Sequence, residues 1–303
     1  MIYISVIFLL TLFFYIFFIF GSFLNNKLNV INRYNFSDCI IFGYAVFTVI
    51  TFHTFFIFGV SNIYLLFFLI IFIIYFHFKH SDLLINKSKN IYIYLILFIT
   101  LSLFFLYPVI VSGEQFYVFR GNYWDSFNYL SSALLFHKHS YQSLLDNNII
   151  NNYLEFQSIK DIINYRPYIT YILSFYLNIK FLDLFLLNYT FKILLSLLNV
   201  FAFFSFLDIF KNISSAKKII LSIIFSFSFF SIYIFEIDAL SHLGSISLLI
   251  LSLKYIYLLF ENNKNSTKNV IFLSVINSAL FIIYPEIFVF FFIIFSCYCF
   301  DQI

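Results

Sequence analysis

The sequence predicts an all-α polytopic membrane protein with about nine transmembrane helices and one long outer loop that carries interfacial helices. Apolar residues make up 63% of the 303 residues, and charged residues only 10%. Soluble domains typically contain about 45–50% apolar and about 25% charged residues. Several apolar runs reach the ~20 residues that a helix needs to cross a hydrocarbon core of about 30 Å. A soluble fold could not bury this much apolar surface.

The candidate spans are the apolar runs between polar segments. They lie at residues 2–20, 39–59, 62–78, 91–111, 184–209, 219–235, 244–260, 270–284 and 286–300. A shorter apolar run at 168–178 is too short to cross the membrane upright. It is predicted to be re-entrant or interfacial, and the start of a long tilted span is the alternative.

The basic residues between the spans predict the orientation. Lys and Arg occur in the connections after the first span, before the fourth, at 210–218 and at 261–269. The other short connections, near 60–61, 236–243 and 285, contain neither. Because short cytoplasmic loops are enriched in Lys and Arg, the basic connections are predicted to be cytoplasmic. The N-terminus and the loop 112–167 are then predicted to lie on the outer face. The membrane itself is predicted to be the bacterial plasma membrane.

The chain divides into two predicted portions. Residues 1–90 form a three-span portion with a cytoplasmic basic loop, and residues 91–303 form a second transmembrane module that includes loop 112–167. The net charge of +3 is too weak to indicate nucleic acid as a partner. No basic residue precedes the first apolar run, so this run is predicted to be a span and not a cleavable signal. The stop at Ile303, directly after an apolar run, keeps a fragment among the interpretations.

The long outer loop contains many of the few charged residues and the only Trp, Trp124. From Asp125 onward, apolar residues recur at helical spacing, which is typical of an amphipathic helix at the membrane surface. They are Phe127, Leu130, Leu134 and Leu135. Asp125 stands at the N-terminal edge of this helix, where a carboxylate caps free amides. The alternative is a functional carboxylate at the membrane boundary that acts as a base or a metal ligand.

Two further acidic sites lie in the predicted outer connections. Glu236 and Asp238 are two residues apart with no basic neighbour, a pattern that favours a bound cation. A short solvated loop explains them equally well, and the nearby His242 is interpreted as a boundary residue. Glu286 follows Pro285 between two apolar runs. It is either part of an outer turn or a functional carboxylate within the membrane.

Basic residues at the ends of spans have two interpretations. Arg166 stands where the outer loop re-enters the membrane, and Arg can hold a phosphate there. It can equally extend towards lipid headgroups. Lys192 and Asp208 are interpreted as boundary residues near the ends of a span.

The layout resembles that of polytopic glycosyltransferases of the GT-C type. In that family a cytoplasmic basic loop leads into a span, and a long outer loop follows with an acidic residue soon after the span. A second acidic motif stands in the next outer loop. The span 91–111, Asp125 and the pair Glu236 and Asp238 follow this plan, and the segment WDSFNYLSSALL is similar to the corresponding family segment. The resemblance covers roughly residues 91–300.

The resemblance implies a sugar transfer from a polyprenyl-phosphate donor to a cell-envelope acceptor. Asp125 would be the catalytic base, and Glu236 and Asp238 would bind a divalent metal ion, Mg or Mn, or position the acceptor. The donor and its phosphate would contact residues of the outer loop and its borders. These residues are Arg120, Trp124, Arg166 and Glu286. The sequence departs from the family pattern because Asp125 has no acidic neighbour and because later spans of the family are absent.

Two other functions remain open at this stage. A transporter or flippase for lipid-linked saccharides would have inverted repeats and charged residues at mid-membrane depth. The sequence shows neither feature clearly, and Glu286 keeps this interpretation open. A non-catalytic membrane subunit or fragment is the third interpretation.

Overall fold

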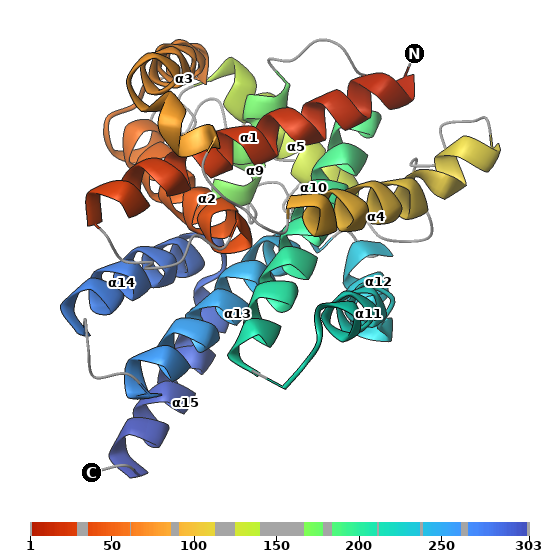
Figure 1. Cartoon of the computed structure of the whole chain (residues 1–303). Helices are drawn as coiled ribbons and strands as arrows, with labels where there is room; N and C mark the ends of the chain where they lie inside the picture. Colours follow the sequence, from red (N-terminus) through yellow and green to blue (C-terminus); the bar gives the residue numbers. More distant parts are fainter. Residues whose placement is uncertain are drawn as a thin grey trace.

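The computed structural model describes residues 2–28, 36–60, 62–85, 91–112, 125–139, 167–177, 184–210, 212–236, 239–261 and 266–301. Within these ranges the regular structure is helical and contains no strand. The helices form one bundle in which α10 and α13 are central, with α1 to α4 along one side and α14 and α15 along another (Figure 1).

Each predicted span coincides with a helix or with a pair of helices. The helices are α1 (Ile2–Leu28), α2 (Phe36–Phe52), α3 (Asn62–Ile85), α4 (Ile91–Ser112), α5 (Asp125–Lys138), α9 (Pro167–Tyr176), α10 (Leu184–Phe206), α11 (Ser215–Ser226), α12 (Phe229–Glu236), α13 (Leu240–Glu261), α14 (Ser266–Ile283) and α15 (Pro285–Asp301). A π-helical turn, His53–Ile57, extends α2, and a 3-10 turn, Leu207–Ile209, extends α10.

Five helical segments of the described chain are long and apolar enough to cross a membrane. They are Ile4–Asn26, Phe36–Ile57, Tyr92–Val109, Leu186–Ile209 and Leu240–Glu261. The pair α11 and α12 gives a sixth if its 49° bend is counted within one span. The segments Tyr64–Lys79 and Thr267–Ile283 are apolar but shorter. This architecture is compatible with an integral membrane protein, but it does not confirm the predicted count of nine spans.

Helices α1 and α2 pack along each other with a very close backbone approach. A Cβ atom added to Gly21 would overlap the carbonyl group of Cys39, and one added to Gly43 would overlap that of Phe17. Small residues at a helix interface allow such contact, and the short distance increases dispersion attraction between the helices. Both glycines are therefore required by the crossing of the two helices.

The short helix α9 lies inside the bundle. Its residues from Tyr168 to Phe175 are buried, and it packs against α5, α10, α13 and α14. The Tyr168 hydroxyl also shares a 2.5 Å hydrogen bond with Thr51 of α2. The run predicted as re-entrant or interfacial is thus enclosed by protein, as a re-entrant helix would be.

Helix α5 forms where the amphipathic pattern predicts it, but its buried face is partly different. Leu130 and Leu135 are buried as expected, whereas Leu134 is 37% exposed. The polar residues Asn128 and Ser132 are buried instead. The difference arises because α5 packs against other helices, chiefly α9, and protein neighbours accommodate polar groups that hydrocarbon would exclude.

Candidate functional site

The structure describes only part of the site predicted from the sequence. Arg120, Trp124, Arg166 and Asp238 lie outside the described residues. Asp125 is the first residue of α5 and Glu236 is the last residue of α12, so their places in the fold are known while their side chains are not described. Glu286 is exposed in the first turn of α15, directly after the bend between α14 and α15.

The first half of α5 contacts the beginning of α13. The hydroxyl groups of Tyr129 and Ser241 are 3.4 Å apart. Tyr129 follows Asp125 by about one helical turn, and Ser241 follows Asp238 by three residues. The helix that begins at Asp125 therefore contacts the helix that begins two residues after Asp238.

Lys192 of α10 is buried against the end of α12, with 7% of its surface exposed. Its ammonium group donates a 3.3 Å hydrogen bond to the carbonyl oxygen of Phe235. It also lies 4.7 Å from the ring centre of Phe235 and 5.2 Å from that of Tyr189. The interpretation of Lys192 as a boundary residue is wrong. The last carbonyl groups of α12 lack helical partners and carry partial negative charge, so they attract a cation into the protein interior.

His242 is also held by a partner within the bundle. Its Nε2 atom is 3.0 Å from the hydroxyl oxygen of Tyr284, which stands at the bend between α14 and α15. The two ring centres are 4.4 Å apart. We call the residues Tyr129, Lys192, Phe235, Ser241 and His242 the α5 junction.

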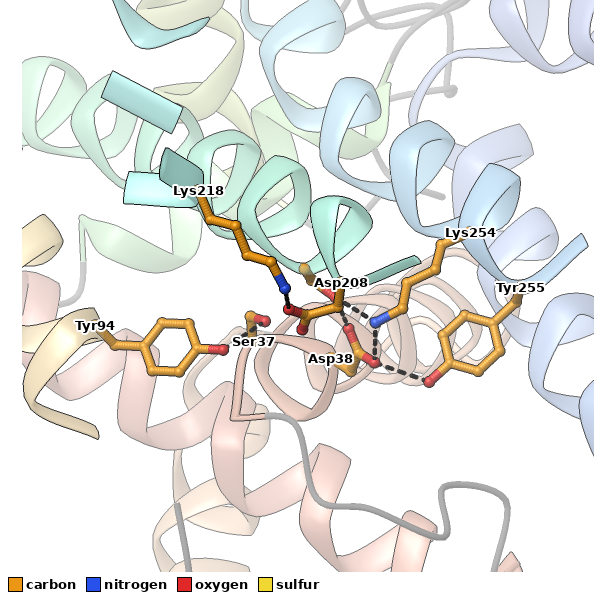
Figure 2. Close-up of polar contacts among 8 residues, drawn as sticks. Ser37, Asp38, Tyr94, Asp208, Lys218, Lys254 and Tyr255 are labelled. Atoms are coloured by element: carbon orange, nitrogen blue, oxygen red, sulfur yellow. Dashed lines mark hydrogen bonds and ion pairs between the residues drawn. The ribbon is translucent and has the colours of Figure 1, made fainter. Parts of the chain in front are cut away.

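A second polar site, absent from the sequence predictions, surrounds Asp38 in the first turn of α2 (Figure 2). The Oδ2 atom of Asp38 accepts hydrogen bonds from Lys254 Nζ at 2.7 Å and from the Tyr255 hydroxyl at 2.9 Å. Its Oδ1 atom accepts one from the Ser205 hydroxyl. Lys254 also donates to the Ser205 oxygen at 2.6 Å. We call Asp38, Ser205, Lys254 and Tyr255 the Asp38 cluster.

The Asp38 cluster is a buried ion pair in which both carboxylate oxygens of Asp38 accept hydrogen bonds. The Asp38 and Lys254 side chains are only 2% and 7% exposed. The cluster joins the beginning of α2 to the last turns of α10 and the second half of α13. Two further contacts flank it in Figure 2, between Ser37 and Tyr94 at 3.3 Å and between Asp208 and Lys218 at 2.5 Å.

The two polar sites lie at opposite ends of the same two helices. On α10, Lys192 and Ser205 are 13 residues apart, which corresponds to about 20 Å along the axis. On α13, His242 and Lys254 are 12 residues apart, or about 18 Å. The chain therefore presents two separate polar centres, one at the α5 junction and one at the Asp38 cluster.

A signal for the Asp38 cluster was present in the sequence. Lys254 lies within the predicted span 244–260, and an ionisable residue inside a span is by itself a candidate functional residue. Asp38 stood directly before the predicted span 39–59 and appeared to be outside it. Their pairing could not be foreseen because 216 residues separate them in the chain.

The described residues contain no group of three or more His, Cys, Asp or Glu side chains that could hold a metal ion. The Asp238 and Glu236 carboxylates are outside that search, so the predicted metal site stays a prediction. Comparisons with models of protein families, with curated proteins and with solved structures found no match to this chain. What the site can do is therefore inferred from its own geometry.

Proposed function

We propose that the chain is a GT-C-like membrane glycosyltransferase that moves a sugar from a polyprenyl-phosphate donor to a cell-envelope acceptor. The contact between Tyr129 and Ser241 carries this proposal. It joins the helix that begins at Asp125 to α13, which begins two residues after Asp238. Sugar transfer needs a base for the acceptor and positive charge for the departing phosphate at one site, and this end of the bundle offers both kinds of group.

The proposed roles of the residues predicted from the sequence are those that the resemblance implies, and Lys192 is added to them from its place in the structure. Asp125 removes the acceptor proton, and Lys192 adds positive charge near the departing phosphate. Arg120, Trp124, Arg166 and Glu286 contact the donor. Glu236 and Asp238 hold a Mg or Mn ion or orient the acceptor, and such an ion would neutralise phosphate charge.

The proposed orientation has the N-terminus and the α5 junction on the outer face of a bacterial plasma membrane, with nine spans. The Asp38 cluster supports it, because this cluster and the contact between Ser37 and Tyr94 join the beginnings of α2 and α4 to the ends of α10 and α13. The basic connections all adjoin these helix ends. They would therefore lie together on the cytoplasmic side, in agreement with the distribution of Lys and Arg.

Labelling of single cysteines tests this orientation. In a variant whose native cysteines are replaced by Ser, Glu286→Cys is expected to react with a membrane-impermeant maleimide added to intact cells, because Glu286 is exposed. Lys217→Cys, at an exposed position near the other end of the bundle, is expected to react only after the cells are opened. The reverse result would invert the proposed orientation and exclude an outer active site.

Sugar transfer by membranes that contain the Asp125→Asn variant tests the function itself. The wild-type chain is expected to transfer sugar from a polyprenyl-phosphate donor. The variant should lose roughly 10²–10⁴-fold in rate at equal abundance, which is the usual contribution of a general base. Glu261→Gln, at an exposed position at the end of α13, is the matched control and should be fully active. An inactive wild-type chain would contradict the enzyme, and an active Asp125→Asn variant would remove Asp125 as the base.

Transport of a lipid-linked saccharide is the second candidate function. One observation favours it, namely that Lys192 and the pair of Asp38 and Lys254 are buried in membrane-spanning candidates. Charged residues within spans commonly line transport pathways. A flipping assay in proteoliposomes separates the two functions, since a transporter moves the intact lipid-linked saccharide across the bilayer and leaves its glycosyl bond uncleaved.

A further inference from the structure

Helices α10 and α13 each contribute to both polar centres of the bundle. Helix α10 provides Lys192 to the α5 junction and Ser205 to the Asp38 cluster. Helix α13 provides Ser241 to the junction and Lys254 and Tyr255 to the cluster. Because a helix is rigid along its length, a shift or rotation at the Asp38 cluster would be transmitted to the α5 junction.

The apolar faces of these helices provide little that would fix their register. Most of the surface that α10 buries consists of Phe, Leu, Ile and Val side chains. In a bilayer the lipid tails are as apolar as these side chains, so apolar contact alone distinguishes poorly between neighbouring registers. A slip of one residue moves a helix by about 1.5 Å and rotates it by roughly 100°.

The bonds of the Asp38 cluster can form in only one register of α10 and α13. The Asp38 carboxylate is bonded to a residue of α10 and to two residues of α13 at the same time. After a slip of α13, the Asp38 and Lys254 charges would lose each other, and breaking a buried pair is strongly unfavourable. A slip of α10 would remove the hydrogen bonds of Ser205 with Asp38 and Lys254. Buried polar groups are known to define the register of packed helices in this way.

We propose that Asp38 is a positioning residue that sets the register of α13 against α2 and α10 and thereby holds the α5 junction in its working geometry. The positional part of this proposal stands on the contacts of Asp38, Ser205, Lys254 and Tyr255. The part that concerns catalysis rests on the proposed function of the α5 junction. The two parts are tested by separate measurements.

The positional test is a crosslink at the α5 junction, read out while the Asp38 cluster is changed. Tyr129→Cys and Ser241→Cys are introduced into a chain whose native cysteines are replaced by Ser, and the pair is bridged by a short bismaleimide. A protease site inserted at the exposed residue Asn212 reports the crosslink, because a bridged chain stays in one piece on a denaturing gel after cleavage. The chain with an intact Asp38 cluster should crosslink efficiently.

The decisive variant replaces the ion pair by apolar residues, Asp38→Leu together with Lys254→Met. Such a replacement leaves no uncompensated charge, so the chain is expected to fold, as judged by its melting temperature and monodispersity in detergent. Most of the crosslink should nevertheless be lost. Without the inserted cysteines, the same replacement should lower kcat for sugar transfer roughly a hundredfold, as a misplacement of about 1 Å can do.

Two additional variants keep the test decisive if the double replacement fails to fold. Tyr255→Phe retains the ion pair but removes the second bond from α13 to Asp38, and it should reduce the crosslink as well. Asp208→Asn with Lys218→Gln removes the neighbouring, partly exposed ion pair and serves as the matched control that should crosslink normally.

The outcomes separate the two proposals. Full crosslinking and full transfer in the folded double variant, or in Tyr255→Phe, would overturn the role of Asp38. Loss of the crosslink in a chain whose cysteine-free parent shows no transfer activity would support the positioning role and reject the glycosyltransferase. Normal crosslinking with lost transfer would show that Asp38 does not act through the geometry of the α5 junction.

Discussion

Replacing Gly43 by Leu is expected to prevent α1 and α2 from packing and to reduce strongly the amount of folded protein. A Cβ atom at this position would overlap the carbonyl group of Phe17 and lie 2.8 Å from the backbone nitrogen of Gly21. Both contacts are with backbone, so a rotation of side chains cannot relieve them. Overpacking of a core commonly costs about 1–3 kcal/mol, and a backbone clash of this kind should reach about 3 kcal/mol or more.

Thermal unfolding in detergent, followed by size-exclusion chromatography, measures the effect of Gly43→Leu. Ser278→Leu on α14 is a suitable control, because Ser278 is exposed on the apolar surface of the bundle and tolerates a larger apolar side chain. The control should have the same melting temperature as the wild-type chain. A melting temperature of Gly43→Leu equal to that of the wild-type chain would contradict the close crossing of α1 and α2.

The single substitution Lys254→Met is expected to destabilise the protein by about 3–5 kcal/mol. It leaves the Asp38 carboxylate buried without a cation, although Ser205 and Tyr255 still donate hydrogen bonds to it. Proteins typically have a total stability of about 5–15 kcal/mol, so the loss would bring many molecules close to unfolding. Asp38→Asn should have a comparable effect, because it leaves the Lys254 ammonium group without its counter-charge.

Lys218→Met is the matched control for the loss of a cation. Its partner Asp208 has a 36% exposed side chain, and exposed ion pairs contribute only about 0–1 kcal/mol. Combining Lys254→Met with Asp38→Leu should restore most of the stability, since no isolated charge then remains. Equal melting temperatures for Lys254→Met and Lys218→Met would contradict the burial of the Asp38 cluster.

The helices could be predicted from the sequence because apolar length is a direct requirement of the hydrocarbon core. The predicted spans 184–209 and 244–260 fall on α10 and α13, and the short run 168–178 falls on the enclosed helix α9. The number of spans was less predictable. An apolar run of the length of α14 can cross the membrane or pack on other helices, and its composition is the same in both cases.

The polar centres were harder to predict, because the cost of a charge inside a membrane depends on its partners. Lys192 seemed to be a boundary residue, yet it is buried against the end of α12. Asp38 seemed to precede its span, but α2 begins at Phe36 and takes Asp38 into the protein. In both cases the partner comes from a distant part of the chain, and this information is not contained in local composition.

The wide separation of Asp38 from Lys254 has a consequence for biogenesis. Translation proceeds at about 5–20 residues per second, so the 216 residues between the two partners take roughly 10–40 s to synthesise. During this time α1 and α2 can already join through Gly21 and Gly43, whereas Asp38 has no counter-charge. The newly made helix pair must keep this carboxylate at the water boundary until α13 arrives. Closure of the ion pair is therefore a late step of assembly, and a chain that stalls before α13 leaves the Asp38 carboxylate without its cation.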